Sequence, residues 1–279
     1  MTSIIQHIRN RIGEHYSNGE VTAISRILIT ELLGFRDNAY FLKEKVTLTE
    51  EQQLQLNNAL EQLCCHRPIQ QILGYEYFCG LKFEVNESVL IPRPETQELV
   101  EWIVSESTGK EDILDIGTGS GCIAISLANR LPLCIVTAFD ISPLALETAK
   151  ENSIRNSCEI HLQQCDILSY QPEENLFDTI VSNPPYIKES EKEQMEANVL
   201  DWEPHIALFV PDTDPLLFYR TIAEKAVTML KPHGKLYFEI NRAHGNEVCK
   251  MLSTLGDTGI LLKKDFAGND RMIRAIKKQ

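Results

Sequence analysis

The sequence has no long apolar run and no excess of basic residues, and each absence excludes a class of protein. No stretch of about 18 consecutive apolar residues occurs, so we expect no membrane-spanning helix. The first residues, MTSIIQHIRNRIGEHY, lack the apolar core of a signal peptide, and we expect a cytoplasmic protein. Its 40 acidic residues outnumber 27 basic ones, which gives a net charge of −13. Because non-specific nucleic-acid binding depends on Lys and Arg, we expect no direct nucleic-acid partner.

The sequence also lacks a C-x-x-C motif and clustered histidines. The eight cysteines are scattered and contain no C-x-x-C pair. We interpret them as reduced packing residues of a cytosolic protein, although the adjacent Cys64 and Cys65 leave a redox pair open. His205, His233 and His244 are isolated and show no ligand spacing, so no metal site is predicted.

The chain divides by pattern into three regions. Residues 1–73 carry apolar side chains near helical spacing, which predicts an N-terminal helical domain. Thr49 is a candidate N-cap for a helix that begins near Glu50. The pattern of the helical region is set by Ile4, Ile5, Ile8, Ile12, Ile24, Ile27, Leu28, Leu32, Leu54, Leu56, Leu60 and Leu63.

A β-hairpin linker is expected at 74–91, because alternating apolar residues are interrupted by Gly80 and Asn86. Residues 92–279 then alternate between strands and helices, after a helix that starts in Pro92-Arg93-Pro94. This alternation predicts an α/β, Rossmann-like fold with a doubly wound, mostly parallel sheet. The last two strands are joined only by a short loop and should pair as an antiparallel hairpin. The seven expected strands are 112–116, 135–139, 159–163, 177–182, 234–240, 258–264 and 271–277.

A glycine turn follows the first strand of this α/β region. Ile116 runs into Gly117-Thr118-Gly119-Ser120-Gly121, and a helix follows. Glycines let the backbone turn tightly and approach a ligand closely. The spacing differs from the G-x-G-x-x-G of pyrophosphate-binding folds, and no Lys-Ser or Lys-Thr follows for a phosphate loop.

Two acidic residues stand at the tips of the next two strands. Asp140 suits a bidentate hydrogen bond to ribose hydroxyls, and its alternative role is to stabilise the start of the next helix. Asp166 can accept a hydrogen bond from an adenine amino group while Ile167 packs on the ring, although a loop cap explains Asp166 equally well. Together the three strand tips predict an adenosine pocket at the carboxyl edge of the sheet.

The glycine turn, Asp140 and Asp166 resemble the motifs of class I S-adenosylmethionine-dependent methyltransferases. The turn can face the carboxylate and ammonium groups of that methyl donor, whereas NAD needs a pyrophosphate cradle. That family also ends its sheet with an antiparallel hairpin.

The motif Asn183-Pro184-Pro185-Tyr186 falls at the tip of the fourth strand. An amide nitrogen is a poor nucleophile because its lone pair is delocalised. The Asn183 side-chain oxygen and the Pro184 carbonyl can accept both of its hydrogens, orient it and stabilise developing positive charge. The prolines keep these acceptors aimed, and Tyr186 offers a π-face to a flat group. The alternative is a plain strand-terminating turn.

The whole chain resembles the PrmC/HemK family of release factor glutamine methyltransferases. The resemblance is carried by R-P-I-Q-Q-I-L-G, F-C-G-L-K-F, V-L-I-P-R-P-E-T, I-V-S-N-P-P-Y-I and D-F-A-G-N-D-R. It implies methyl transfer from S-adenosylmethionine, with S-adenosylhomocysteine as product, to the side-chain amide of the glutamine in the Gly-Gly-Gln loop of peptide chain release factors. The helical domain, residues 1–73, would recognise that protein.

Site residues carry over by matching positions. The resemblance implies donor contacts from residues 117–121, Asp140, Asp166, Ile167 and Asn183, and substrate contacts from residues 183–186. Arg93 either contacts the substrate or braces the linker. Two further residues have open roles: Glu203 lies in a long acidic segment, 188–214, that either covers the active site or is a surface loop, and Glu239 is either structural or near the donor.

The chain departs from the family pattern after the fifth strand, and rival hypotheses about its function stay open. The family often has a Gly and a Gln after the fifth strand, where this chain reads Glu239-Ile240-Asn241-Arg242-Ala243-His244, without Gln. The rival hypotheses are an adenine or cytosine amino methyltransferase acting on DNA or RNA, a methyltransferase of a ribosomal protein, and a donor-binding scaffold without turnover.

Overall fold

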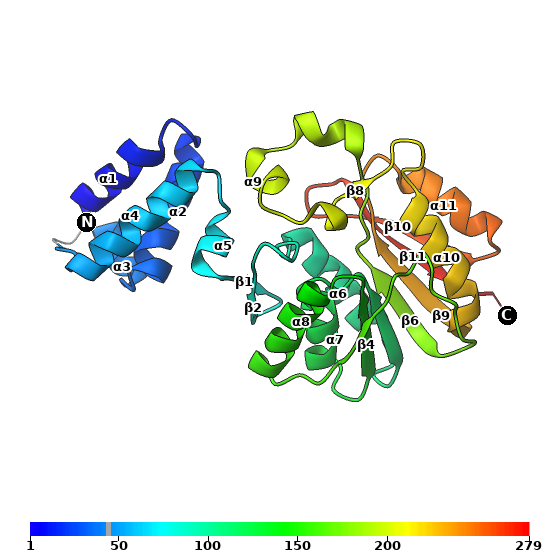
Figure 1. Cartoon of the computed structure of the whole chain (residues 1–279). Coiled ribbons are helices and arrows are strands. Elements are labelled where there is room, and N and C mark those ends of the chain that lie inside the picture. Colours follow the sequence, from blue (N-terminus) through cyan, green and yellow to red (C-terminus); the bar gives the residue numbers. More distant parts are fainter. Residues whose placement is uncertain (43–45, 279) are drawn as a thin grey trace. The chain divides into compact units, whose positions relative to one another are not determined.

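The computed structural model describes residues 1–42 and 46–278, and the contacts within it divide the chain into two units. One unit contains residues 1–74 and 196–202, and the other contains residues 75–195 and the chain from 203 onward. Each unit has its own hydrophobic core. Figure 1 shows the elements of both. The boundaries expected from the sequence at residues 73 and 91 stay predictions.

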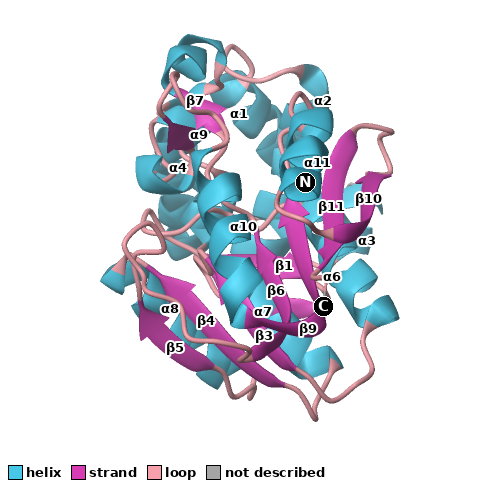
Figure 2. Ribbon diagram, turned by 90° about the vertical axis from the view of Figure 1, so that its right-hand side faces the viewer, coloured by secondary structure: helices cyan, strands magenta, loops and turns pink. Residues whose placement is uncertain are grey.

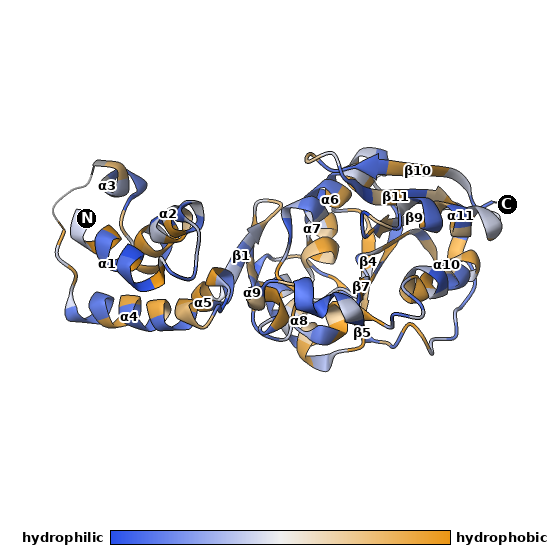
Figure 3. Cartoon of the chain, turned by 90° about the horizontal axis from the view of Figure 1, so that it is seen from above, coloured by the Kyte–Doolittle hydropathy of each residue, from blue (hydrophilic) through white to orange (hydrophobic). Residues whose placement is uncertain are grey.

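The first unit is helical. Apolar residues one turn apart, such as Ile4, Ile8 and Ile12, face its core, and Figure 3 shows the same mixture of polar and apolar positions along α4. Leu54 was counted in the helical pattern, but it is 71% exposed because it lies only two positions from the buried Leu56. The helical segments are α1 (Thr2–Ile12), α2 (Asn18–Ile27), η1 (Leu28–Leu32), α3 (Asp37–Leu42), α4 (Glu50–Cys64), α5 (Ile69–Leu73) and the later α9 (Ala197–Leu200).

Local chemistry explains where α4 begins. The Thr49 side chain accepts a hydrogen bond from the backbone N–H of Gln52, and the Gln52 side chain accepts one from the N–H of Thr49. This reciprocal capping satisfies two N–H groups that a helix start otherwise leaves unpaired. The N-cap predicted at Thr49 is therefore confirmed.

Residues 196–202 join the first unit through Trp202. Its indole N–H donates to the Cys65 carbonyl at 3.0 Å, and its own carbonyl accepts from Gln71 Nε2 at 2.8 Å. The Arg67 guanidinium lies 4.9 Å from the centre of the indole ring, a distance at which a cation is attracted to an aromatic face.

The second unit opens with the predicted hairpin, formed by β1 (Tyr75–Phe78) and β2 (Leu81–Glu84). Its turn is Cys79-Gly80, and both residues have positive φ, as two-residue hairpin turns require. The helix α6 (Pro94–Glu106) then begins at Pro94, whose missing N–H would have no partner in a first helical turn.

The second unit is built on a seven-stranded sheet in the order β10-β11-β9-β6-β3-β4-β5 (Figure 2). Neighbouring strands from β9 to β5 are parallel, and β11 is antiparallel to both β9 and β10. The predicted fold class, with its terminal antiparallel hairpin, is confirmed. The strands are β3 (Asp112–Ile116), β4 (Ile135–Asp140), β5 (His161–Gln164), β6 (Phe177–Ser182), β9 (Leu230–Glu239), β10 (Thr258–Lys264) and β11 (Asp270–Ile276).

Helices cover both faces of this sheet (Figure 1). On one face α6, α7 (Cys122–Arg130) and α8 (Pro143–Arg155) pack in sequence, and on the other lie α10 (Leu217–Met229) and α11 (Gly245–Thr254). Successive residues of a strand point to opposite faces, so Ile113 joins the core under α6 and α7 while Leu114 joins the core under α10. Burial on both faces explains why the central strands β3 and β6 are mainly apolar.

The long acidic segment 188–214 contains several short elements: η2 (Glu189–Gln194), α9, η3 (His205–Ala207) and β8 (Phe209–Val210), with β7 (Ile187–Lys188) at its start. The strands β7 and β8 pair in parallel, which fixes the chain after residue 186 to the chain after residue 208.

Candidate active site

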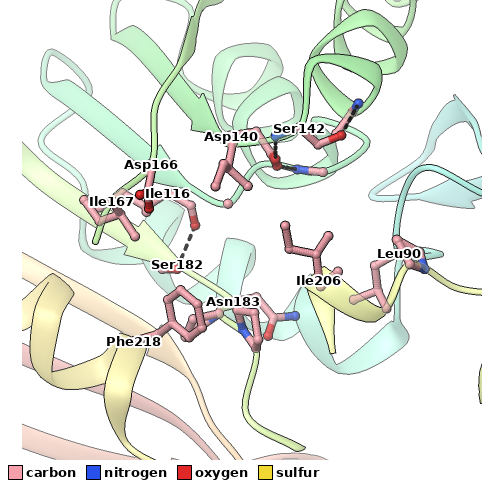
Figure 4. Close-up of a pocket in the computed structure, with 18 of the residues that line it drawn as sticks. Leu90, Ile116, Asp140, Ser142, Asp166, Ile167, Ser182, Asn183, Ile206 and Phe218 are labelled. Atoms are coloured by element: carbon pink, nitrogen blue, oxygen red, sulfur yellow. Dashed lines mark hydrogen bonds between the residues drawn. The ribbon is translucent and has the colours of Figure 1, made fainter. Parts of the chain in front are cut away.

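A cavity of about 260 Å³ lies at the carboxyl edge of the sheet, where β3, β4 and β6 end (Figure 4). Open parallel sheets bind ligands at this edge because the loops diverge there. The cavity is lined mainly by apolar side chains with a few polar groups among them, as is typical of small-molecule sites. Predicted site residues that line it are Gly117, Gly119, Asp140, Asp166, Ile167, Asn183, Pro184 and Pro185.

The glycine turn depends on the absence of side chains. Gly117, Gly119 and Gly121 have φ values of 76°, 55° and 80°, a region that other residues rarely adopt. A Cβ atom at Gly121 would lie 2.8 Å from the Ile125 side chain and 3.2 Å from that of Ala149. Gly121 is therefore needed for close packing between α7 and α8, whereas Gly117 and Gly119 face the cavity.

Most N–H groups of the turn are already used. Those of Gly117 and Thr118 donate to the Phe139 carbonyl at 2.8 and 3.0 Å, and that of Gly119 donates to Asp140 Oδ2 at 2.8 Å. Within the described residues no donor is bonded to the carbonyls of Gly117 or Gly119. The turn thus presents bare backbone and carbonyl oxygens to the cavity, a surface suited to a ligand's ammonium group.

Thr118 and Ser120 lie below this surface and do not line the cavity. The Thr118 hydroxyl donates to Asp115 Oδ2 at 2.7 Å. Asp115 is fully buried, and this burial raises its pKa to about 7. The predicted donor contacts from Thr118 and Ser120 therefore stay proposals, and the observed role of Thr118 is to brace the turn through Asp115.

Asp140 organises the donor side of the cavity. Its Oδ2 accepts from Gly119 N and its Oδ1 accepts from Ser142 N at 2.9 Å. Burial raises its pKa, while these backbone donors oppose that shift. Each carboxylate oxygen has a second lone pair, so the group retains acceptors for a diol while its orientation is fixed (Figure 4).

Asp166 and Ile167 follow β5 and line the same cavity. Asp166 Oδ1 accepts from Leu168 N at 2.9 Å, so the loop-cap role considered from the sequence is present. Ile167 is only 8% exposed and joins the core under α10. The pair therefore gives the cavity an apolar wall with a carboxylate beside it.

Asn183 lies at the tip of β6 and is labelled beside Phe218 and Ile206 in Figure 4. Within the described residues its side-chain amide makes no hydrogen bond, and no donor is bonded to the Pro184 carbonyl. The backbone on either side is held firmly: Ser182 Oγ donates to the Ile116 carbonyl at 2.7 Å, and Tyr186 N donates to the Leu208 carbonyl at 3.2 Å. Two open acceptors thus face a ligand cavity from a fixed turn.

Tyr186 is the member of the motif that does not line the cavity. It packs against the core under α10, and burial raises its pKa to about 12. Glu239 lies close enough to raise that pKa further. Glu239 itself is 2% exposed and accepts from Thr96 Oγ1 at 2.6 Å. Burial raises the pKa of Glu239 to about 7, and its observed role is to brace β9 against α6.

Arg93 and Glu203 form an ion pair. The Glu203 side chain is almost fully buried and also accepts from Ile91 N at 3.3 Å. Leu90 and Pro204, which adjoin Ile91 and Glu203 in the chain, both line the cavity. Arg93 is outside the lining, so its observed contact is the bracing one that the sequence left open.

Several lining residues were missed by sequence reasoning. Leu90 comes from an irregular segment, Ile206 from the short helix η3 and Phe218 from the start of α10. They appear in Figure 4 around Asn183. No motif or strand period marks them, because only the folded chain brings them to the cavity. Ser142 and Ser182 were also missed, although each adjoins a predicted strand tip.

Two features are absent from residues 1–42 and 46–278. None of the helices there has both the length and the apolar character needed to cross a bilayer. No group of three or more His, Cys, Asp or Glu side chains is placed to hold a metal ion.

Two family models and a solved structure match parts of this chain. Residues 94–201 match the family model described as Methyltransferase small domain, and residues 3–74 match the one described as PrmC N-terminal domain. A solved methyltransferase from Pyrococcus furiosus has a TM-score of 0.55 and 22% identity, over 72% of this chain and 90% of that one. That likeness shows the fold alone. Fold and site together define a class I S-adenosylmethionine-dependent methyltransferase.

Curated relatives specify the family within that class. A release factor glutamine methyltransferase from Bacteroides thetaiotaomicron is 45% identical over 276 residues, which is 99% of both chains. Another of the same name, from Flavobacterium psychrophilum, is 50% identical over 238 residues, 84% of each chain. A third, from Streptococcus pneumoniae, is 43% identical over 243 residues, 86% of each chain. The chain belongs to the release factor glutamine methyltransferase family.

The cavity fits the methyl donor of this class. The open carbonyls of Gly117 and Gly119 suit its ammonium group, and Asp140 suits its ribose hydroxyls. Ile167 supplies an apolar wall for a flat adenine ring. The groups on the donor side therefore match the three chemically different parts of S-adenosylmethionine.

Proposed function

We propose that this protein transfers a methyl group from S-adenosylmethionine to the side-chain amide nitrogen of the glutamine in the Gly-Gly-Gln loop of peptide chain release factors. The observation that carries the proposal is the unpaired Asn183 amide, which lies on the same cavity as Asp140 and the glycine turn. The curated names of relatives that match this chain over 84–99% of their length support the same substrate.

The substrate amide would be held by two acceptors. Asn183 Oδ1 takes one N–H hydrogen and the Pro184 carbonyl takes the other, so the nitrogen cannot rotate away from the donor. Both oxygens also stabilise the positive charge that develops on this nitrogen as it attacks. Pro184 and Pro185 have restricted φ angles, which keep the two acceptors in register.

S-adenosylmethionine supplies a methyl group attached to a positively charged sulfur, and S-adenosylhomocysteine leaves. The new N–CH₃ bond forms as the S–CH₃ bond breaks, and one N–H proton passes to water. No strong base is needed, because the proton becomes acidic once nitrogen is methylated. This agrees with a cavity where the charged residues in the lining are the two acids Asp140 and Asp166.

The remaining assignments follow the same proposal. Residues 117–121, Asp140, Asp166, Ile167 and Asn183 contact the donor. Tyr186 assists the substrate site from its packed position, and residues 1–73 recognise the release factor. Because release factors act on cytoplasmic ribosomes, we place the reaction in the cytoplasm, with no nucleic-acid partner.

The test is intact-mass analysis of a purified bacterial release factor after incubation with enzyme and donor. One added methyl group on the Gly-Gly-Gln glutamine is expected. Parallel reactions with ribosomal protein and with DNA or RNA address the rival substrates, and methylation of only one of those would overturn the assignment. Donor binding without any methyl transfer would identify a scaffold instead.

A variant pair tests the site itself. Asn183→Ala should lower kcat by about 10²- to 10³-fold, as the loss of one fixed charge-stabilising group does in other enzymes. Asn175→Gly is the control, because it removes an amide just before the same strand, at the opposite edge, and keeps a backbone with φ of 54°. Unchanged turnover in Asn183→Ala, with a normal melting curve, would reject the role assigned to this residue.

A further inference from the structure

The loop between β10 and β11, residues 265–269, lies at the same edge of the sheet as the active site. The strands β9 and β10 are each antiparallel to β11, so they run in the same direction as each other. The end of β10 at Lys264 therefore points to the carboxyl edge, as do the ends of β9 and β6. The sequence motif D-F-A-G-N-D-R contains this loop, and nothing in the proposed reaction uses it.

Hydrogen bonds hold this loop in one shape. Asp265 is 6% exposed, and its carboxylate accepts from Asn269 N at 2.9 Å and from Arg271 Nε at 3.1 Å. Its own N–H donates to the Asn269 carbonyl at 2.9 Å, and its carbonyl accepts from Gly268 N at 2.9 Å. A buried carboxylate with several donors is costly to disturb, so the loop is a preformed support.

This support presents one aromatic ring to solvent. Phe266 is 96% exposed, more than any other large hydrophobic side chain among the described residues. Its backbone N–H donates to Glu98 Oε1 of α6 at 3.1 Å, so the backbone beneath the ring is fixed. Aromatic rings that are exposed on rigid supports are typical anchors of protein interfaces, because little conformational entropy is lost on binding.

A protein substrate bound at Asn183 can reach the Phe266 ring. The strand order β10-β11-β9-β6 separates the loop from the tip of β6 by two to three strand positions. At about 4.8 Å per position this is roughly 10–15 Å along the edge. Roughly three to five residues of extended chain span that distance, at about 3.3 Å each. A protein loop that presents a glutamine to Asn183 is therefore long enough to reach this part of the edge.

We propose that Phe266 is a docking contact for the protein substrate, packing on apolar surface of the release factor beside its Gly-Gly-Gln loop. This inference rests on the proposed function and adds a specificity-determining residue outside the reaction cavity. Phe266 would raise the occupancy of the folded substrate and would not touch the reacting atoms. Its effect should therefore appear in KM, whereas kcat and donor affinity remain as they are.

The experiment compares Phe266→Ala with Phe266→Leu and Leu133→Ala, using a folded bacterial release factor as substrate. Leu133 is a matched control, because it is 72% exposed and precedes β4 at the opposite edge of the sheet. Truncation of an interface anchor typically costs tenfold or more in affinity. We expect KM for the release factor to rise by about tenfold in Phe266→Ala. Phe266→Leu should recover part of it, and Leu133→Ala should match the unmodified protein.

Each of the other outcomes would reject the docking role of Phe266. An unchanged KM in Phe266→Ala would overturn the docking role. A change in donor dissociation constant, or in sedimentation of the free enzyme, would overturn it too, by assigning the ring to the cavity or to self-association. Failure of the unmodified enzyme to methylate the release factor would refute the proposed function first, and the docking role with it. The unmodified reaction therefore separates the two failures.

Discussion

The two sides of the cavity are organised by different means. On the donor side, both oxygens of Asp140 accept backbone N–H groups, and Asp166 Oδ1 accepts another. On the substrate side, the Asn183 amide and the Pro184 carbonyl have no partner within the described residues. The donor side is thus fixed through its functional groups, whereas the substrate side is fixed through its backbone and leaves its acceptors open.

This difference suits the two ligands. Ribose hydroxyls need acceptors of fixed orientation and tolerate neighbours that share the same carboxylate. A substrate amide must give up both hydrogens to acceptors that are strongest as its charge changes. An acceptor already engaged by the protein would respond less to that change.

The largest expected effect is on the glycine turn of the donor side. Gly121→Ala should lower the free energy of unfolding by about 3 kcal/mol, because positive φ and a clash with Ile125 act together. Gly117→Ala is the matched change, since nothing lies within 4 Å of its Cβ position. It should cost only about 1 kcal/mol of stability yet weaken donor binding. Denaturant titration and calorimetry measure both, and equal losses of stability would contradict this account.

On the substrate side, the feature to test is the stiffness of the backbone at the two prolines of the turn. Replacing Pro184 and Pro185 together by Ala keeps the carbonyl but frees the turn. Misplacement by about 1 Å can cost 10²-fold in rate, so kcat should fall by up to about 100-fold with donor affinity unchanged. Pro232→Ala, at an exposed position of β9, is the control. If the double variant retains full kcat, the prolines are not what aims the acceptors.

The hydrogen bonds of Asp140 can be weakened without removing its shape. Asp140→Asn has one acceptor oxygen in place of two, so it cannot keep both Gly119 N and Ser142 N. Loss of a charge-assisted hydrogen bond of about 2 kcal/mol weakens donor binding about thirtyfold. Calorimetry with S-adenosylhomocysteine measures this, with Glu147→Gln on the exposed side of α8 as control. If Asp140→Asn changed kcat and left the affinity for S-adenosylhomocysteine unchanged, Asp140 would not belong to the donor side of the cavity.

The smallest effect concerns Glu239, buried next to the substrate side. Its raised pKa, about 7, means that the folded protein holds this proton more tightly than the unfolded chain does. Stability therefore falls as pH rises from the ordinary range of a glutamate towards 7, where the folded carboxyl ionises. Glu239→Gln removes that penalty and retains an acceptor for Thr96.

As the pH rises from 6 to 8, the free energy of unfolding of Glu239→Gln should increase by about 1–2 kcal/mol relative to that of the unmodified protein. Asp115, whose pKa is also raised to about 7, is present in both proteins. Its contribution to the pH dependence of stability is therefore the same in both and cancels in the difference. Urea titrations at the two pH values give the result. A constant difference between the two proteins would show that Glu239 does not titrate in this window.

Much of the fold was predictable because its signals are local. Strands that are buried on both faces read as apolar runs, so the strands at 112–116 and 177–182 were predicted at their observed bounds. The start of β9 was predicted at residue 234, whereas the strand begins at Leu230. Pro232 and Gly234 are residue types that are uncommon inside strands, but proline is tolerated near the start of one.

The site was predictable only where motifs mark it. Asp140, Asp166 and Asn183 each follow a strand, and parallel strands bring their carboxyl ends to one edge, so their meeting in one cavity followed from the order of elements. Leu90 and Ile206 line the same cavity from segments that carry no period. Nothing local to those segments encodes where they lie in the folded chain.

By itself, the sequence determined the order of strands and helices, the left-handed glycine turn and the stiff Asn-Pro-Pro turn, because these depend on residues adjacent in the chain. Only the tertiary structure decided that Tyr186 packs into the core, that Arg93 pairs with Glu203, and that Phe266 stays in solvent. Burial and ion pairing depend on which distant residues surround a side chain, and that environment exists only after the sheet and its helices have assembled.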